Sequence, residues 1–90
     1  MGNLLDLKPS KSPEVAEKIG SVTMLFDASS GRLFELNETG KTAWTLLDGK
    51  RSVREVAEAI AAEYGMDPSQ VAEDLARFVK EMLEFNLLRA

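Results

Sequence analysis

The sequence contains no cysteine and no histidine. The absence of cysteine excludes disulfides, thiolate nucleophiles and thiolate-held iron–sulfur clusters, and without histidine as well the usual zinc sites are excluded. The side chain that most often shuttles protons near neutral pH is also missing. Carboxylates are the only common metal ligands left, so the composition predicts no cofactor.

Long apolar runs are missing too. No segment approaches the roughly 20 apolar residues that cross a bilayer. Residues 1–6 lack the basic-then-apolar layout of a signal peptide. We therefore expect a cytoplasmic protein that does not bind membranes.

Basic residues are scarce in the second half of the chain. Residues 52–90 carry four Lys/Arg and eight Asp/Glu, whereas residues 1–51 carry seven of each, and the net charge is -4. An acidic surface repels the phosphate backbone that supplies most of the affinity for nucleic acid. The charge distribution therefore argues against a nucleic-acid partner.

What is present suits one small globular domain. The 90 residues are 44% hydrophobic and 29% charged, and a chain of this length forms a single core. Pro9 and Pro13 bias their preceding residues away from helix, and the Lys and Ser residues around them offer nothing to bury. We expect residues 1–14 to be an extended lead-in and residues 15–90 to be the domain.

Residues 21–36 alternate in the manner of strands. Val22, Met24 and Phe26 alternate with Ser21, Thr23 and Leu25, which predicts a strand with one buried face. Residues 32–36 predict a second strand, and residues 27–31 a turn in which Gly31 takes a positive φ. The pattern of residues 15–19 fits either a further strand or a helical turn.

After Leu36 the apolar period changes to that of a helix. Capping residues divide this part of the chain into three predicted helices. The first follows the N-cap Asn37 and runs from about Glu38 through Leu47, with Gly49 as its stop. The second opens with a capping box formed by Ser52 and Glu55, and Gly65 follows its end. The third has Asp67 as its N-cap, Pro68 at the first helical position and Gln70 as a box partner. It runs to about Phe85 and ends near Asn86.

The third predicted helix has an apolar arc of about 200°, roughly twice what one core needs. Two interpretations fit this width. The helix packs against both the sheet and the other helices, or it presents a second surface to a partner.

The residues that could carry chemistry are few. The carboxylate pairs Glu55/Glu58, Glu73/Asp74 and Glu81/Glu84 fall at helix-surface positions, where solvated charge is the usual explanation. Trp44 lies among apolar helix positions and is expected in the core, although stacking on a ligand is conceivable. We therefore expect a protein that is not an enzyme.

Two helices joined by Gly65-Met66-Asp67, beside a hairpin, match a winged helix-turn-helix. Ser69 and Gln70 could then touch base edges. The first two turns of that recognition helix contain no Lys or Arg, while Glu73 and Asp74 are acidic. The pattern has the architecture of a DNA-binding domain without its charge.

A longer string of residues carries a family resemblance. Residues 36–40 are Leu-Asn-Glu-Thr-Gly, residues 43–44 are Ala-Trp, and residues 46–49 are Leu-Leu-Asp-Gly. Residues 52–56 (Ser-Val-Arg-Glu-Val), 64–68 (Tyr-Gly-Met-Asp-Pro) and 85–88 (Phe-Asn-Leu-Leu) continue it. From about Val22 to Leu88 the chain resembles the PqqD family. It departs from the commonest pattern at Gly40, where alanine is frequent, a change that weakens the first helix slightly.

The resemblance implies an α+β, winged-helix-like fold, in which an N-terminal three-stranded antiparallel sheet is followed by three helices. Residues 15–19 then form the first strand. It also implies a recognition element, or peptide chaperone, for ribosomally made precursor peptides. The leader segment of the peptide adds as a strand to the sheet edge beside the third helix, and a partner enzyme, often a radical S-adenosylmethionine protein, modifies the core segment.

Strand addition requires an edge with free N–H and C=O groups and pockets for alternate side chains. We expect residues 32–36 to provide the edge and the third helix to line the groove beside it. If Phe34 donates its N–H to the peptide, Phe34→Pro should abolish binding. The predicted peptide-binding residues are Arg32, Leu33, Phe34, Glu35 and Leu36 of the strand, and Ala72, Leu75, Ala76, Phe78 and Val79 of the helix.

The favoured hypothesis is thus a leader-peptide-binding module, expected as a monomer or a weak homodimer. The alternatives are a winged-helix DNA-binding or transcription-associated domain, and a structural interaction domain that once belonged to a larger enzyme. Salt separates the first two, because binding to DNA weakens steeply as the salt concentration rises.

Overall fold

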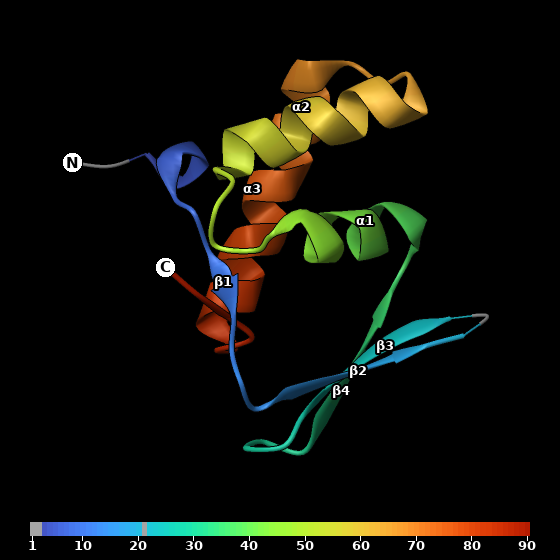
Figure 1. The fold of residues 1–90 in the computed structure, drawn as a ribbon, viewed down its shortest axis with the longest axis vertical. Coiled ribbons are helices and arrows are strands. Elements are labelled where there is room, and N and C mark those ends of the chain that lie inside the picture. The colour runs from blue at the N-terminus through green and yellow to red at the C-terminus, as the bar shows by residue number, and fades with distance from the viewer. Residues whose placement is uncertain (1–2, 21) are drawn as a thin grey trace.

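The computed structural model describes residues 3–20 and 22–90. An antiparallel sheet of order β2-β3-β4 is followed by three helices. Figure 1 shows the helices gathered on one side of the sheet, with α1 following β4 directly. This confirms the predicted α+β fold, including a strand over residues 15–19. The elements are β2 (Val15–Ile19), β3 (Thr23–Asp27), β4 (Arg32–Leu36), α1 (Glu38–Leu46), α2 (Val53–Tyr64) and α3 (Pro68–Glu84).

The sheet buries one face against the helices. Thr23, Leu25 and Asp27 of β3 are buried, whereas Phe26 is 41% exposed on the other face. The alternation predicted the strand correctly, but the more apolar of its two sets of side chains is not the buried one. Leu33 stands opposite Phe26 in the register and is 64% exposed, so the outer face of the sheet carries an apolar pair.

The turn between β3 and β4 is built on Asp27. Its carboxylate accepts hydrogen bonds from the Ser29 N–H at 3.1 Å and from the Ser29 and Ser30 hydroxyls at 2.8 Å each. The Ser30 hydroxyl, followed by that of Ser29, holds the pKa of Asp27 below its ordinary value because these bonds favour the ionised form. Gly31 has φ 76°, as predicted.

The three helices begin where the capping residues predicted. Asn37 accepts from the Gly40 N–H, and Asp67 accepts from the Ser69 N–H. The sequence predicted Gln70 as the partner in a capping box at this helix start. The prediction was wrong, because the Gln70 side chain donates to Asp74. At the C-terminal ends, Gly65 and Asn86 have φ 64° and 59°, the left-handed conformation that ends a helix.

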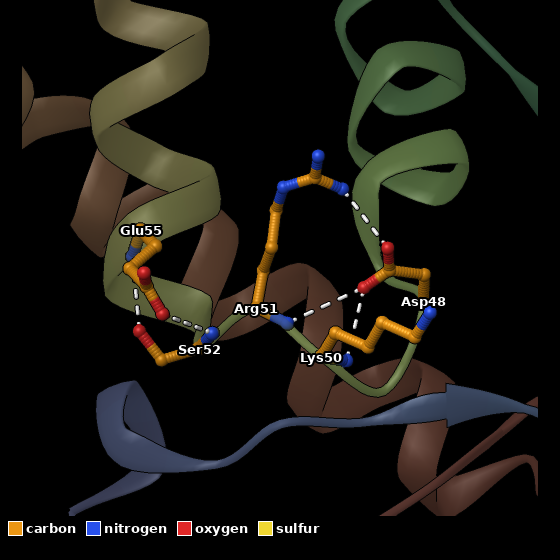
Figure 2. Close-up of polar contacts among 5 residues, drawn as sticks. All are labelled: Asp48, Lys50, Arg51, Ser52 and Glu55. Carbon is orange, nitrogen blue, oxygen red and sulfur yellow. Dashed lines mark hydrogen bonds and ion pairs between the residues drawn. The ribbon is translucent and has the colours of Figure 1, made fainter.

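The connection from α1 to α2 is a dense set of caps (Figure 2). Asp48 accepts from the N–H groups of Lys50 and Arg51 at 3.0 and 3.3 Å and pairs with the Arg51 guanidinium at 3.0 Å. Ser52 and Glu55 form the predicted capping box. The Lys50 N–H is the main cause of the lowered pKa of Asp48, and the Ser52 N–H is the main cause of the lowered pKa of Glu55.

The core is formed mainly among the three helices, and Leu25 and Leu36 of the sheet join it. Trp44 is buried, as predicted, and its Nε1–H donates to the Glu17 carboxylate of β2. The Lys11 ammonium lies 5.6 Å from the centre of its ring. The tryptophan therefore joins α1 to the sheet.

Residues 3–14 are more than a lead-in with nothing to bury. β1 (Ser10–Lys11) pairs antiparallel with β5 (Leu88–Arg89), which lies beside it in Figure 1. Pro9 and Ser12 are buried, and the Ser12 hydroxyl donates to the Asn86 carbonyl at 2.6 Å. The expectation failed because the partners of this segment lie at the far end of the sequence.

Candidate functional site

The strand β4 is an open edge of the sheet, because β3 is its only strand partner among the described residues. An antiparallel strand directs the backbone groups of alternate residues to opposite sides. The Ala28 N–H donates to the Glu14 carbonyl, and these residues stand opposite each other in the β2–β3 register. Counting back from Ala28 in steps of two, the backbone N–H and C=O groups of Phe26 and Met24 therefore point toward β2.

The intervening residues of β3 are Thr23, Leu25 and Asp27, and their partners on β4 are Leu36, Phe34 and Arg32. The N–H of Phe34 consequently points toward β3 and is not available to a peptide. Leu33 and Glu35 are the residues whose N–H and C=O groups face outward. A strand added to β4 would bond these two residues.

The side chains of β4 divide between the two faces of the sheet. Phe34 and Leu36 face the helices and are half-buried and buried, whereas Leu33 and Glu35 are exposed. The Phe34 ring lies 5.4 Å from the ring of Phe85, and the Arg32 guanidinium lies 4.8 Å from the centre of the same ring. An aromatic cluster thus closes the Arg32 end of the edge.

The helix α3 brings only part of its apolar arc to β4. Phe78 and Phe85 are seven positions apart, two turns on one flank, and Phe78 borders Glu35 and Leu36 across a hollow. Leu75 and Val79 are buried beneath this flank and support it. This arrangement supports the interpretation that the wide arc packs against several elements.

Ala72 and Ala76 are half-buried on the flank of α3 that faces away from Phe78, since they lie more than 100° around the helix from it. Of the ten predicted peptide-binding residues, the structure therefore brings together the β4 residues and Phe78, with Leu75 and Val79 behind them. The role of each in binding a peptide stays a prediction.

Two pockets lie at the Leu36 end of the edge. The smaller, about 340 Å³, lies between the start of α1, the α2–α3 turn and α3, and its apolar wall comprises Ala43, Ile60, Met66, Val71, Leu75 and Phe78. The other, about 420 Å³, is lined by Glu35, Leu36, Asn37, Gly40 and Phe78. A strand paired with β4 would therefore meet two pockets beyond Leu36.

Sequence reasoning missed Phe85, Asn37 and Gly40 as parts of this site. Asn37 and Gly40 were recognised only as parts of a helix start, and Phe85 only as the end of α3. Helical spacing places Phe85 on the flank of Phe78, which was the available signal. Without the position of the sheet, the sequence does not tell which flank faces β4.

Within residues 3–20 and 22–90, no group of three or more Asp and Glu residues is placed to hold a metal ion. The three lowered pKa values belong to Asp27, Asp48 and Glu55, each in a turn or cap. None of the helices in the described part of the chain is both long and apolar enough to cross a membrane.

A family model described as coenzyme PQQ synthesis protein D (PqqD) matches residues 23–88. The chain belongs to the PqqD family. Among curated protein sequences, none is similar enough to count as a match.

Solved structures similar to this PqqD-family chain are titled as complexes or recognition elements. "TbiB1 in Complex with the TbiA(beta) Leader Peptide" is 29% identical, with a TM-score of 0.79 over 90% of this chain and 95% of that one. "Lasso peptide synthetase B1 complexed with the leader peptide" is 23% identical, with a TM-score of 0.81 over 92% and 99%. The PqqD truncation of Methylobacterium extorquens PqqCD, titled a functional and stand-alone RiPP recognition element, is 19% identical, with a TM-score of 0.76 over 91% and 88%. The last two likenesses concern the fold alone.

Proposed function

We propose that this PqqD-family chain binds the leader segment of a ribosomally made precursor peptide, which adds as a strand to β4. The observation that carries the proposal is the geometry of this edge. Leu33 and Glu35 direct backbone donors and acceptors outward, and the apolar flank of α3 with Phe78 and Phe85 lies beside them. Backbone bonds give such a complex its affinity, and pockets for alternate side chains give it specificity.

Similarity to a solved complex also supports the proposal. TbiB1, which is 29% identical over nearly its whole length, is titled as a complex with a leader peptide. The same function is consistent with the acidic second half of this chain, because a peptide, unlike DNA, brings no phosphate backbone to the surface.

In this function the chain contributes binding and the chemistry belongs to a partner enzyme, which we propose is a radical S-adenosylmethionine protein or another peptide-modifying enzyme. Holding the leader converts the encounter between the core segment and the active site into a nearly intramolecular event. The rate gain comes from effective concentration, so the module needs no nucleophile or general base of its own.

The test is a backbone-amide NMR titration of the labelled protein with synthetic leader segments from short reading frames beside its gene and with the TbiA(beta) leader. We expect shifts at residues 32–36 and along the Phe78–Phe85 flank of α3, and slowed hydrogen exchange at Leu33 and Glu35. The absence of shifts with every peptide would overturn the proposal. Salt-sensitive binding to duplex DNA in the same protein would favour the winged-helix alternative.

A further inference from the structure

The two pockets beside β4 share part of their walls. Asn37, Gly40 and Phe78 line both of them. The first two belong to the start of α1 and the third to α3, so the pockets meet where these helices approach each other beyond Leu36. A strand paired with β4 that continues past Leu36 passes over this junction.

Gly40 keeps the junction open. A Cβ atom at this position would lie 3.0 Å from Asn37 Oδ1 and 3.6 Å from Leu36 Cβ. The first distance is tighter than an ordinary van der Waals contact, so even a methyl group would crowd the N-cap. A larger side chain would extend into the space between the pockets.

The 340 Å³ pocket suits one large apolar side chain. Its wall is mostly aliphatic and aromatic, with Asn37, Thr39 and Asp74 as polar lining residues. Pockets for small-molecule ligands span about 300 to 1,000 Å³, so this one is at the small end of the range. Met66 is 42% exposed at the α2–α3 turn, and its flexible thioether side chain can adapt to the occupant.

We propose that this pocket receives an aromatic or large aliphatic side chain of the leader peptide, and that Gly40 is the specificity-determining residue that admits it. The proposal rests on the proposed function of the chain. Alternate side chains of a strand point to the same face. The anchoring residue is therefore two positions beyond the peptide residue that faces Leu36, on the side that continues past β4.

The first experiment probes the pocket without a leader. N-acetyl-phenylalaninamide and N-acetyl-alaninamide are titrated at millimolar concentration into methyl-labelled protein. We expect only the phenylalanine compound to shift the methyl signals of Ile60, Val71 and Leu75. Gly40→Leu should remove these shifts, whereas Thr45→Leu, on the exposed side of α1, should leave them unchanged.

The second experiment uses whichever leader binds in the backbone titration. Gly40→Leu should weaken its binding at least tenfold relative to wild type and Thr45→Leu, and replacing the anchoring residue of the peptide by alanine should weaken it equally. The two changes together should weaken binding little further, because both remove the same contact. Gly40→Ala, expected to give a smaller loss, serves if Gly40→Leu does not fold.

The outcomes separate the two proposals. One outcome is a leader that shifts the amide signals of β4 and yet binds equally well to Gly40→Leu and after its anchoring residue is replaced. This result would overturn the proposed role of the pocket and leave the proposed function intact. Shifts from N-acetyl-phenylalaninamide without binding of any leader overturn the proposed function and the leader as the occupant, while the preference of the pocket for an apolar side chain stands. Equal shifts from the alanine compound overturn the pocket.

Discussion

The sheet has two open edges, and they differ in what lies beside them. On β2 Val15 and Glu17 share the side that faces the helices; Val15 packs against the core, and the Glu17 carboxylate accepts from the indole N–H of Trp44. On β4 the residues that face the helices are Phe34 and Leu36, next to the pockets and Phe78. Both edges present outward backbone groups, and β4 has beside it the pocket lined by Glu35, Leu36 and Phe78, which could take the side chains of an added strand.

The difference shows that an open edge is not by itself a binding site. Inward-pointing charge is one of the ways in which proteins keep edge strands from pairing, and Glu17 places such a charge on β2. Arg32 and Glu35 are charged as well, but Arg32 stacks on Phe85 and Glu35 faces outward. Arg32 lies on the helix-facing side of β4 together with Phe34 and Leu36, so the two edges differ in the partner of the inward charge: an aromatic ring for Arg32 and an indole N–H for Glu17.

The strongest way to break this comparison is to remove a backbone donor from β4. Glu35→Pro removes an outward N–H without disturbing the ladder to β3, and we expect at least a 30-fold loss of leader affinity, about 2 kcal/mol. Glu35→Ala keeps the donor and should change affinity by no more than about threefold, since exposed charges contribute little. Isothermal titration calorimetry measures both. Equal losses in the two variants would place the peptide elsewhere.

A change on β2 should act on stability and leave binding alone. Glu17→Ala leaves the buried Trp44 N–H without its acceptor, which we expect to lower the free energy of unfolding by about 1 kcal/mol. Lys18→Ala, next to it on the outer face, is the matched control and should be nearly neutral. Urea denaturation reads the stability, and a parallel loss of leader affinity in Glu17→Ala would contradict the assignment of β2 as a structural edge.

Acid should loosen the hairpin that carries β4. The pKa of Asp27 is lower in the folded state than its ordinary value of 3.8, so the ionised carboxylate stabilises the fold above that pH. This contribution is lost as the pH falls below 3.8 through the folded-state pKa. Protection factors of the β3–β4 hairpin amides, measured between pH 5 and 2.5 and corrected for intrinsic exchange, should fall in that window, and Asp27→Asn should remove this step. An unchanged profile in the variant would assign the step to Asp48 or Glu55.

Salt should have the smallest effect. The charges beside β4 are exposed and screened in water, so a rise in NaCl concentration from about 50 to 500 mM should change leader affinity by about threefold or less. The control is duplex DNA of mixed sequence, for which any binding should fall steeply over the same range. A steep salt dependence for the leader would mean that charge, and not the strand ladder, carries the affinity.

The sequence predicted features that depend on local chemistry. The caps at Asn37, Ser52 and Asp67 and the left-handed ends at Gly65 and Asn86 each depend on residues within one helical turn, and all were confirmed. Apart from the capping box at Gln70, whose side chain bonds Asp74 four residues further on, the features it missed depend on distant partners. The outer position of Phe26 follows from how the sheet meets the helices, because alternation marks two faces without telling which one is covered.

The candidate site divides in the same way. The edge strand could be predicted because a hairpin is local, and the family resemblance placed the third helix beside it. The sequence could not predict which flank of α3 faces β4, because Phe78 and Ala76 both belong to one continuous apolar arc. The outward donors Leu33 and Glu35 follow only from the hydrogen bond between Ala28 and Glu14, which fixes the phase of the whole sheet.

The pairing of β1 with β5 has a consequence for how the molecule is made. Ser12 and Asn86 are 74 positions apart, and contacts between such distant residues form late because a long loop must close first. During synthesis the hairpin of β3 and β4 can form before α3 and the partner of β1, which follow it in the chain. The edge is therefore present before its groove, and a nascent chain should hold a peptide only after α3 has folded beside β4.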